Sequence, residues 1–202
     1  MEKFENCNIT YNTDNLTIKA DKDLYNNSFY FEDFLDDHNF SRLIKSIERE
    51  IRSSIEYNMY LSLLKSNCPI LTSDNIQNNI SDDFTDIEMH HYPLTLADIV
   101  ESVLIHRELN KIKITSFSVA KEIMELHFKN KIGLVPLSVT NHELAHNGAL
   151  FISKKQIFGD WEYFLKEYAD GISGIIKENI KKLEEYSESH ISSDFNGIYT
   201  YD

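Results

Sequence analysis

The chain has 202 residues, of which 42% are hydrophobic and 26% are charged, and its formal net charge at pH 7 is −13. This length and composition are typical of a soluble protein with a real core, and the acidity argues against strong general binding to nucleic acid. No apolar run approaches the roughly 20 residues that span a bilayer, and the acidic start is unlike a signal peptide, so we expect a cytoplasmic protein with no membrane partner.

The first part of the chain is predicted to be a lead-in followed by one long helix. Residues 1–38 are polar with short alternating stretches, which favours a small hairpin or irregular structure. From about Ser41 to Lys65, apolar residues recur every three or four positions, which is the period of an amphipathic helix. The residues of this stripe are Ile44, Ile47, Ile51, Ile55 and Met59. Pro69 ends the helix, because proline restricts the residue before it to extended conformations.

The middle of the chain is predicted to contain a short strand and two helices. A polar loop precedes the strand, which covers residues 86–90. Thr95 and Asp98 form a capping box that begins one helix, and Ser116 or Ser118 begins the next. The predicted buried residues are Leu96, Ile99, Val100, Val103 and Leu104 in the first helix and Val119, Ile123 and Leu126 in the second.

The last part of the chain is predicted to be mostly helical. Residues 149–152 favour a short strand. The stretch from Asp160 to about Ser187 has apolar residues at largely helical spacing, and Gly171 and Gly174 weaken its middle. Residues after Ser187 are predicted to form a frayed tail.

Four of the eight histidines lie in two short stretches, Glu88–Pro93 and Gly133–Gly148. In the second stretch, Thr140 and Glu143 have the spacing of a capping box, which predicts a helix from about Asn141 to the stop at Gly148. His142 and His146 are one turn apart on this helix, so they share a face and can bind one cation together.

His90 ends the predicted strand and His91 follows it, so if the backbone remains extended the two side chains point to opposite faces. One imidazole can therefore bind a metal ion while the other faces a substrate. His127 has no such partner in the sequence, and we interpret it as a core or surface histidine. His38, His106 and His190 receive no role.

The stretches Glu-Met-His-His-Tyr-Pro and HELAHNG resemble the HNH, or His-Me finger, nucleases, and most closely the colicin-type branch. The phrases HHYPLTLADIV, EIMELHFKNKIGLVPLS and HELAHNGALFI also look like phage-encoded HNH-like proteins of uncharacterised role. The resemblance covers roughly residues 86–169. It implies a ββα-metal finger, in which two strands and a short helix hold a divalent ion.

The resemblance also implies a role for each residue of the motif. His90, His142 and His146 would hold the divalent ion, which would be Zn, Ni, Mn or Mg. His91 would be the general base that activates water for phosphodiester cleavage in DNA or RNA, because an imidazole titrates near neutral pH. Glu88 would orient one of the metal ligands.

Two departures from the family pattern affect these expectations. The two predicted helices between the halves of the motif must form an insertion in the finger. The position of the family's name-giving asparagine is occupied by Gly133, with Asn130 three residues earlier, which puts the geometry or the activity in doubt.

Two alternatives remain open at this point. His142-Glu143-Leu144-Ala145-His146 also matches the HExxH motif of zinc metallopeptidases, with Glu143 as base and Glu162 or Glu167 as a third ligand. The other alternative is a non-catalytic, metal-stabilised structural or binding protein of a phage, cytoplasmic in the host or associated with the virion. The acidity and Gly133 favour it.

The predicted fold class is α+β, mostly helical, with a ββα-metal finger that carries a helical insertion. The predicted divisions are a lead-in and long helix (1–72), the finger with its insertion (73–170), and a C-terminal helix and tail (171–202). If nucleic acid is the partner, cations must border the metal site, and we expect these to come from the ends of the inserted helices. The candidates are Arg107, Lys111, Lys113, Lys129 and Lys131.

Overall fold

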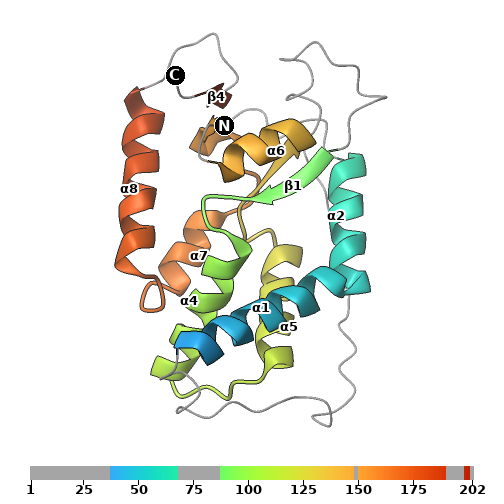
Figure 1. Ribbon diagram of the computed structural model, residues 1–202, viewed down its shortest axis with the longest axis vertical. Helices are drawn as coiled ribbons and strands as arrows, with labels where there is room; N and C mark the ends of the chain where they lie inside the picture. Colours follow the sequence, from blue (N-terminus) through green and yellow to red (C-terminus); the bar gives the residue numbers. More distant parts are fainter. Residues whose placement is uncertain (1–36, 68–86, 148–149, 190–197, 201–202) are drawn as a thin grey trace.

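The computed structural model describes residues 37–67, 87–147, 150–189 and 198–200 (Figure 1). Residues 1–36 of the predicted lead-in and the polar loop before the strand lie outside these ranges, whereas residues 37 and 38 begin the first helix. In chain order the elements are α1 (Asp37–Ser53), α2 (Ile55–Asn67), β1 (Ile87–His91), α4 (Leu96–Leu109), α5 (Ser116–Phe128), β2 (Leu134–Ser138), α6 (Val139–His146), β3 (Leu150–Ile152), η6 (Lys154–Gln156), α7 (Trp161–Glu167), α8 (Gly174–Ser189) and β4 (Ile198–Thr200). The described residues are mostly helical with small antiparallel sheets, which confirms the predicted fold class.

The strand, strand and helix order expected for a finger is present in β1, β2 and α6. The two strands are antiparallel, and His91 pairs with Leu134 at one end while Ile87 pairs with Ser138 at the other. α4 and α5 lie between these strands in the sequence, where two helices were predicted. Helix α6 begins directly after β2.

The two inserted helices begin where the sequence predicts. The Thr95 side chain accepts a hydrogen bond from the backbone of Asp98, and Asp98 accepts one from the backbone of Thr95, which is the predicted capping box. Thr115 caps α5 in the same way, so the helix begins at Ser116. Every predicted buried residue of both helices is buried.

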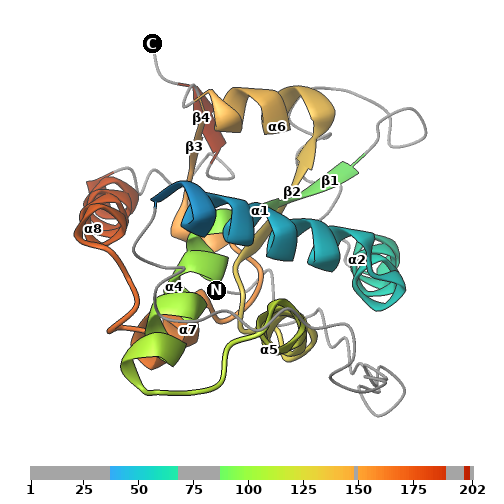
Figure 2. The same ribbon diagram turned by 60° about the horizontal axis from the view of Figure 1, so that its bottom comes forward.

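The β1–β2 pair lies between α6 and a larger group of helices. Figure 2 shows α6 on one side of the two strands and α1, α4 and α5 on the other. The buried apolar residues form one cluster that runs from Leu43 in α1 to Leu183 in α8. The described parts of all three predicted divisions therefore share a core. None of the described helices is long and apolar enough to span a membrane.

The prediction of one long helix is wrong, because the helix is interrupted at Ser54 and forms two helices, α1 and α2. The Ser54 hydroxyl oxygen accepts a hydrogen bond from the Tyr57 backbone and caps a new helix. The change of direction leaves Ile55 and Met59 exposed at 73% and 52%, and α2 buries Tyr57, Tyr60 and Leu64 instead.

The C-terminal prediction needs two corrections. The expected helix is divided into α7 and α8, because Gly171 packs so closely on α4 that an added Cβ would lie 2.0 Å from the Ser102 carbonyl oxygen. Residues 198–200 of the expected tail form β4, which pairs with β3. The strand expected at residues 149–152 is confirmed as β3.

Candidate metal centre

The helix that carries two of the histidines begins earlier than predicted. Ser138 is the N-cap of α6, and its hydroxyl oxygen accepts a hydrogen bond from the Asn141 backbone at 3.3 Å. The helix therefore starts at Val139, and the predicted N-cap at Thr140 is wrong. Ser138 is also the last residue of β2, so strand and helix join without a loop. This short connection fixes the helix over one face of the sheet.

Three of the four motif histidines converge between β1 and α6. His90, His142 and His146 each offer a ring nitrogen, and these atoms all lie within 4.8 Å of one another. The His90 ring lies 4.9 Å from each of the other two ring centroids, and the Nε2 atoms of His142 and His146 are 3.0 Å apart. The one-turn spacing on the helix and the position of His90 on the facing strand produce this arrangement.

Glu88 lies on the same face of β1 as His90, two residues away, and contacts Nδ1 of His142. A carboxylate at this atom holds the imidazole with its proton on Nδ1, so the lone pair of Nε2 points toward the other histidines. The structure thus places Glu88 where a carboxylate orients a metal ligand.

Burial and charge keep His90 in the form that binds metals. Burial, and then the neighbouring His142 and His146, lower the pKa of His90 from 6.5 to about 4. At neutral pH its imidazole is neutral and has a lone pair to donate. Three imidazole ligands suit zinc and other borderline divalent ions better than magnesium. His146 is exposed, so a bound ion would keep access to solvent.

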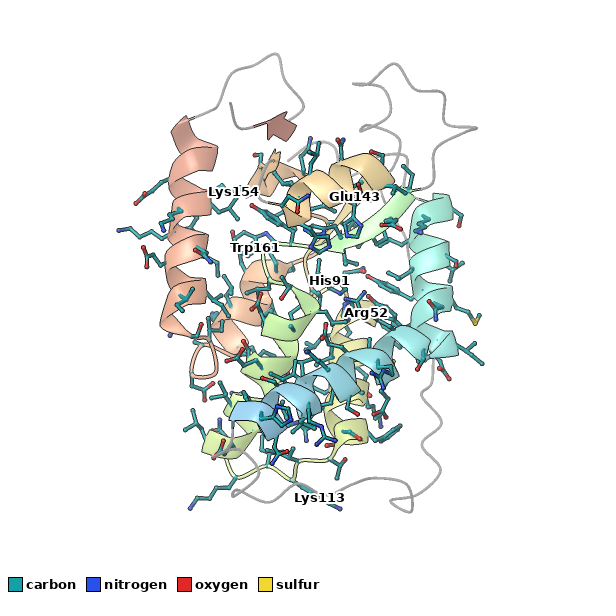
Figure 3. The ribbon with its side chains drawn as sticks, in the orientation of Figure 1. Arg52, His91, Lys113, Glu143, Lys154 and Trp161 are labelled. Atoms are coloured by element: carbon teal, nitrogen blue, oxygen red, sulfur yellow. The ribbon has the colours of Figure 1, made fainter. Side chains whose placement is uncertain are left out.

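His91 lies on the opposite face of β1, away from these three histidines. It is only 8% exposed, and its Nε2 lies 3.0 Å from Nε2 of His127 on α5 and 3.2 Å from the hydroxyl of Tyr57 on α2. Burial, and then the charges of His127 and Arg52, lower the pKa of His91 well below its ordinary value. Figure 3 shows His91 beneath β1, toward the helices, while Glu143 lies above on α6.

The position of the family's asparagine cannot hold a side chain in this fold. A Cβ added to Gly133 would lie 2.0 Å from the Tyr92 carbonyl oxygen, and the Gly133 carbonyl accepts a hydrogen bond from the Tyr92 backbone. Asn130 does not replace the missing group at the metal centre, because its side chain accepts a hydrogen bond from Tyr60. The connection after β1 is therefore held by backbone contacts.

The ligand set that the metallopeptidase alternative requires is not formed by the described residues. His90 completes the group with His142 and His146, and neither Glu162 nor Glu167 belongs to it. Glu143 is exposed on α6, and because the helix starts at Val139 it does not occupy the capping-box position.

Two of the cations expected to border the metal site, Arg107 and Lys113, lie away from it. Lys113 lies at the opposite end of the molecule from Glu143 (Figure 3), and Arg107 donates a hydrogen bond to the Lys113 carbonyl at 2.6 Å. Arg107 also pairs with Glu122. Lys131 pairs with Asp160 at 2.6 Å. Arg107, in the last turn of α4, and Lys113, in the connection from α4 to α5, lie far from the sheet, whereas Lys131 lies in the connection from α5 to β2.

The fold and the site define a class of protein: a mostly helical α+β protein in which a strand, strand and helix unit gathers three histidines. The chain belongs to the bacteriophage G278-like virion protein family, whose profile matches residues 2–198. This match supports a phage origin and an association with the virion. Comparison with curated proteins and with solved structures found no match.

Two residues near His91 were not predicted to interact with it. His127 is fully buried, and Tyr57 comes from α2, far from the motif in the sequence. In the sequence, His127 lies on a predicted helix between two apolar residues, Leu126 and Phe128. This pattern indicates that His127 is buried, but it does not identify the residue that His127 contacts.

Proposed function

We propose that this protein is a structural component of a phage particle in which a divalent cation, held by His90, His142 and His146, fastens α6 to the β1–β2 sheet. The observation that carries the proposal is the poor burial of α6, whose described side chains are all half-buried or exposed. A helix of 8 residues is too short to be stable alone. A cation bound by ligands from both strand and helix would supply the missing stabilisation.

Removal of the metal with EDTA tests this proposal. A ligand present at 100 times its Kd stabilises a protein by about 2.7 kcal/mol, so chelation is expected to lower Tm by roughly 5–10 °C. Hydrogen exchange should show that α6 amides lose protection while those of α4 and α5 keep it. His146→Ala should abolish the response to EDTA, and His38→Ala, a change at an exposed histidine outside the group, should preserve it.

Protection of α6 that does not change on chelation would contradict the structural role of the cation. The virion part of the proposal has its own test. Mass spectrometry of purified particles should detect the chain at a fixed ratio to the other virion proteins, and its absence from particles would contradict that part alone.

The strand, strand and helix order favours a second candidate, a metal-dependent endonuclease. In this candidate His91 is the base, the three other histidines hold the ion, and the exposed side at His146 admits phosphate and water. The burial of His91, the distant cations and the net charge of −13 weigh against it. This is why we place the structural role first.

A pair of variants separates the catalytic candidates. For an endonuclease, His91→Ala should abolish plasmid nicking and keep the ion of the other three histidines, because the base is lost and those ligands are not. Glu143→Gln should keep nicking. Loss of peptide hydrolysis in Glu143→Gln would instead support the metallopeptidase, and the absence of both activities in the wild type would leave the structural role.

A further inference from the structure

A second cluster of metal-binding side chains lies beneath β1, in the core. It consists of His91 from β1, His127 from α5 and Tyr57 from α2, which are 8%, 0% and 3% exposed. Nε2 of His91 lies 3.0 Å from Nε2 of His127 and 3.2 Å from the Tyr57 hydroxyl oxygen. Three elements that are far apart in the sequence thus bring an imidazole and a phenol to the Nε2 atom of His91.

The protons of this cluster do not satisfy every polar atom. Nδ1–H of His127 donates to the Ile123 carbonyl at 2.7 Å, so Nε2 of His127 carries a lone pair. If Nε2–H of His91 donates to that lone pair, the Tyr57 hydroxyl hydrogen has no acceptor among the described residues. If Tyr57 donates to His91 instead, two imidazole lone pairs face each other at 3.0 Å. Among the described residues, either arrangement leaves a buried polar group without a hydrogen-bond partner, which is unfavourable.

We propose that Nε2 of His91, Nε2 of His127 and the Tyr57 hydroxyl oxygen form a second, buried site for a divalent first-row metal ion, with zinc as the best match. Two ligands on a tetrahedral zinc ion lie roughly 3.3 Å apart, because each bond is about 2.0–2.1 Å long. The separations of 3.0 and 3.2 Å at His91 are close to that value. The His142 and His146 nitrogens in the outer group show the same 3.0 Å separation.

The surroundings of the cluster support a bound cation. The bond from His127 to Ile123 is the backbone contact that metal-binding histidines commonly make with their second nitrogen. Burial raises the pKa of Tyr57, and the nearby Arg52 charge opposes this rise. A coordinated ion would favour the phenolate far more strongly, since a bound cation reverses the effect of burial on an acidic ligand.

The net charge of the site does not distinguish a metal ion from an extra proton. A divalent ion with one phenolate leaves a single positive charge in the core, which is the charge that one extra proton would leave. A metal ion differs from a proton because all three side chains would bind it at once. One further ligand, such as a water molecule, would complete tetrahedral coordination.

The buried ion should differ from the outer one in its exchange with solvent. The full chain is unfolded in guanidinium with EDTA, refolded with Zn²⁺, desalted, and then treated with EDTA in the native state. We expect one zinc ion per chain to resist the second EDTA treatment. The double variant His142→Ala/His146→Ala, which lacks the outer group, should keep this ion.

Conservative variants identify the ligands. His127→Gln and Tyr57→Phe should each lower the EDTA-resistant zinc at least tenfold, whereas Tyr60→Phe should keep it. Tyr60 is a suitable control because it is buried in the same helix and its hydroxyl donates to Asn130 instead. After refolding with Co²⁺, Tyr57→Phe should also change the visible absorption spectrum of the resistant ion, because it removes an oxygen ligand.

Near-ultraviolet circular dichroism must show that each variant is folded before its zinc is counted. A folded wild type without EDTA-resistant zinc would overturn the proposal and leave a neutral hydrogen-bonded cluster. Undiminished resistant zinc in both Tyr57→Phe and His127→Gln would overturn it as well. The inference does not rest on the outer site, since it concerns different residues and a different fraction of the metal.

Discussion

The two neighbouring histidines of β1 have different surroundings because their side chains lie on opposite faces of the strand. His90 and Glu88 face α6, and His91 faces α2 and α5. Their opposite orientation was predictable from the alternation of a strand. Which face would be interior was not predictable, because the interior is formed by Tyr57 and His127, whose positions depend on the packing of two helices far away in the sequence.

Glu88→Gln tests whether the carboxylate orients His142. An amide cannot carry the charge that makes the imidazole a better donor, so the affinity of the outer site for Zn²⁺ should fall by 10–100-fold. Competition with a chromophoric chelator measures this affinity. Glu143→Gln is the matched control, because Glu143 is exposed on α6, the helix that carries His142. Equal affinity for Glu88→Gln and wild type would contradict the assigned contact.

The buried His127 predicts how stability depends on pH. Burial lowers its folded-state pKa from 6.5 to about 4, so between these values the unfolded chain binds more protons than the folded chain. Stability should therefore fall as the pH falls through this window, by about 3 kcal/mol from this residue in metal-free protein.

Urea unfolding at pH 7 and at pH 4.5 measures this dependence. His127→Gln should show a shallower fall than the wild type, because glutamine has no proton to gain. The buried His90 and His91 contribute with the same sign, so some dependence should remain. A variant with the same pH dependence as the wild type would contradict the assigned state of His127.

At the scale of elements, local signals predicted the helix starts at Thr95 and Ser116 and failed at Ser54. Thr95 carries a complete capping box within four residues. Ser54 has no such box, and its hydroxyl also donates to the sulfur of Met124 on α5 at 3.0 Å. That contact depends on tertiary packing, so the stripe that continues to Met59 in the sequence gave no sign of the break.

The close approach after β1 predicts a large difference between two glycine substitutions. Gly133→Ala should lower the free energy of unfolding by several kcal/mol, because its Cβ would lie 2.0 Å from the Tyr92 carbonyl oxygen. Gly174→Ala should be neutral or stabilising by up to about 1 kcal/mol, since its Cβ meets nothing within 4 Å and alanine favours a helix. Urea denaturation compares the two, and equal stabilities would contradict the packing described here.

At the scale of the whole molecule, the sequence predicted the fold class and the group of three histidines but not the position of the charges. Arg107 lies in the last turn of α4, and Lys113 lies in the connection from α4 to α5. The packing of the core sets the direction of both helices. In the structure these two side chains lie at the far end from α6. Arg107 and Lys113 therefore place no positive charge at the metal centre, which weighs against phosphate binding by these two side chains.

Metal analysis of the purified chain tests the central claim most directly. Elemental analysis by mass spectrometry should find that His142→Ala contains one divalent ion fewer per chain than the wild type. His106→Ala should equal the wild type, because His106 lies outside the group and contacts Asp170. His142→Ala with the full wild-type metal content would contradict the site formed by His90, His142 and His146.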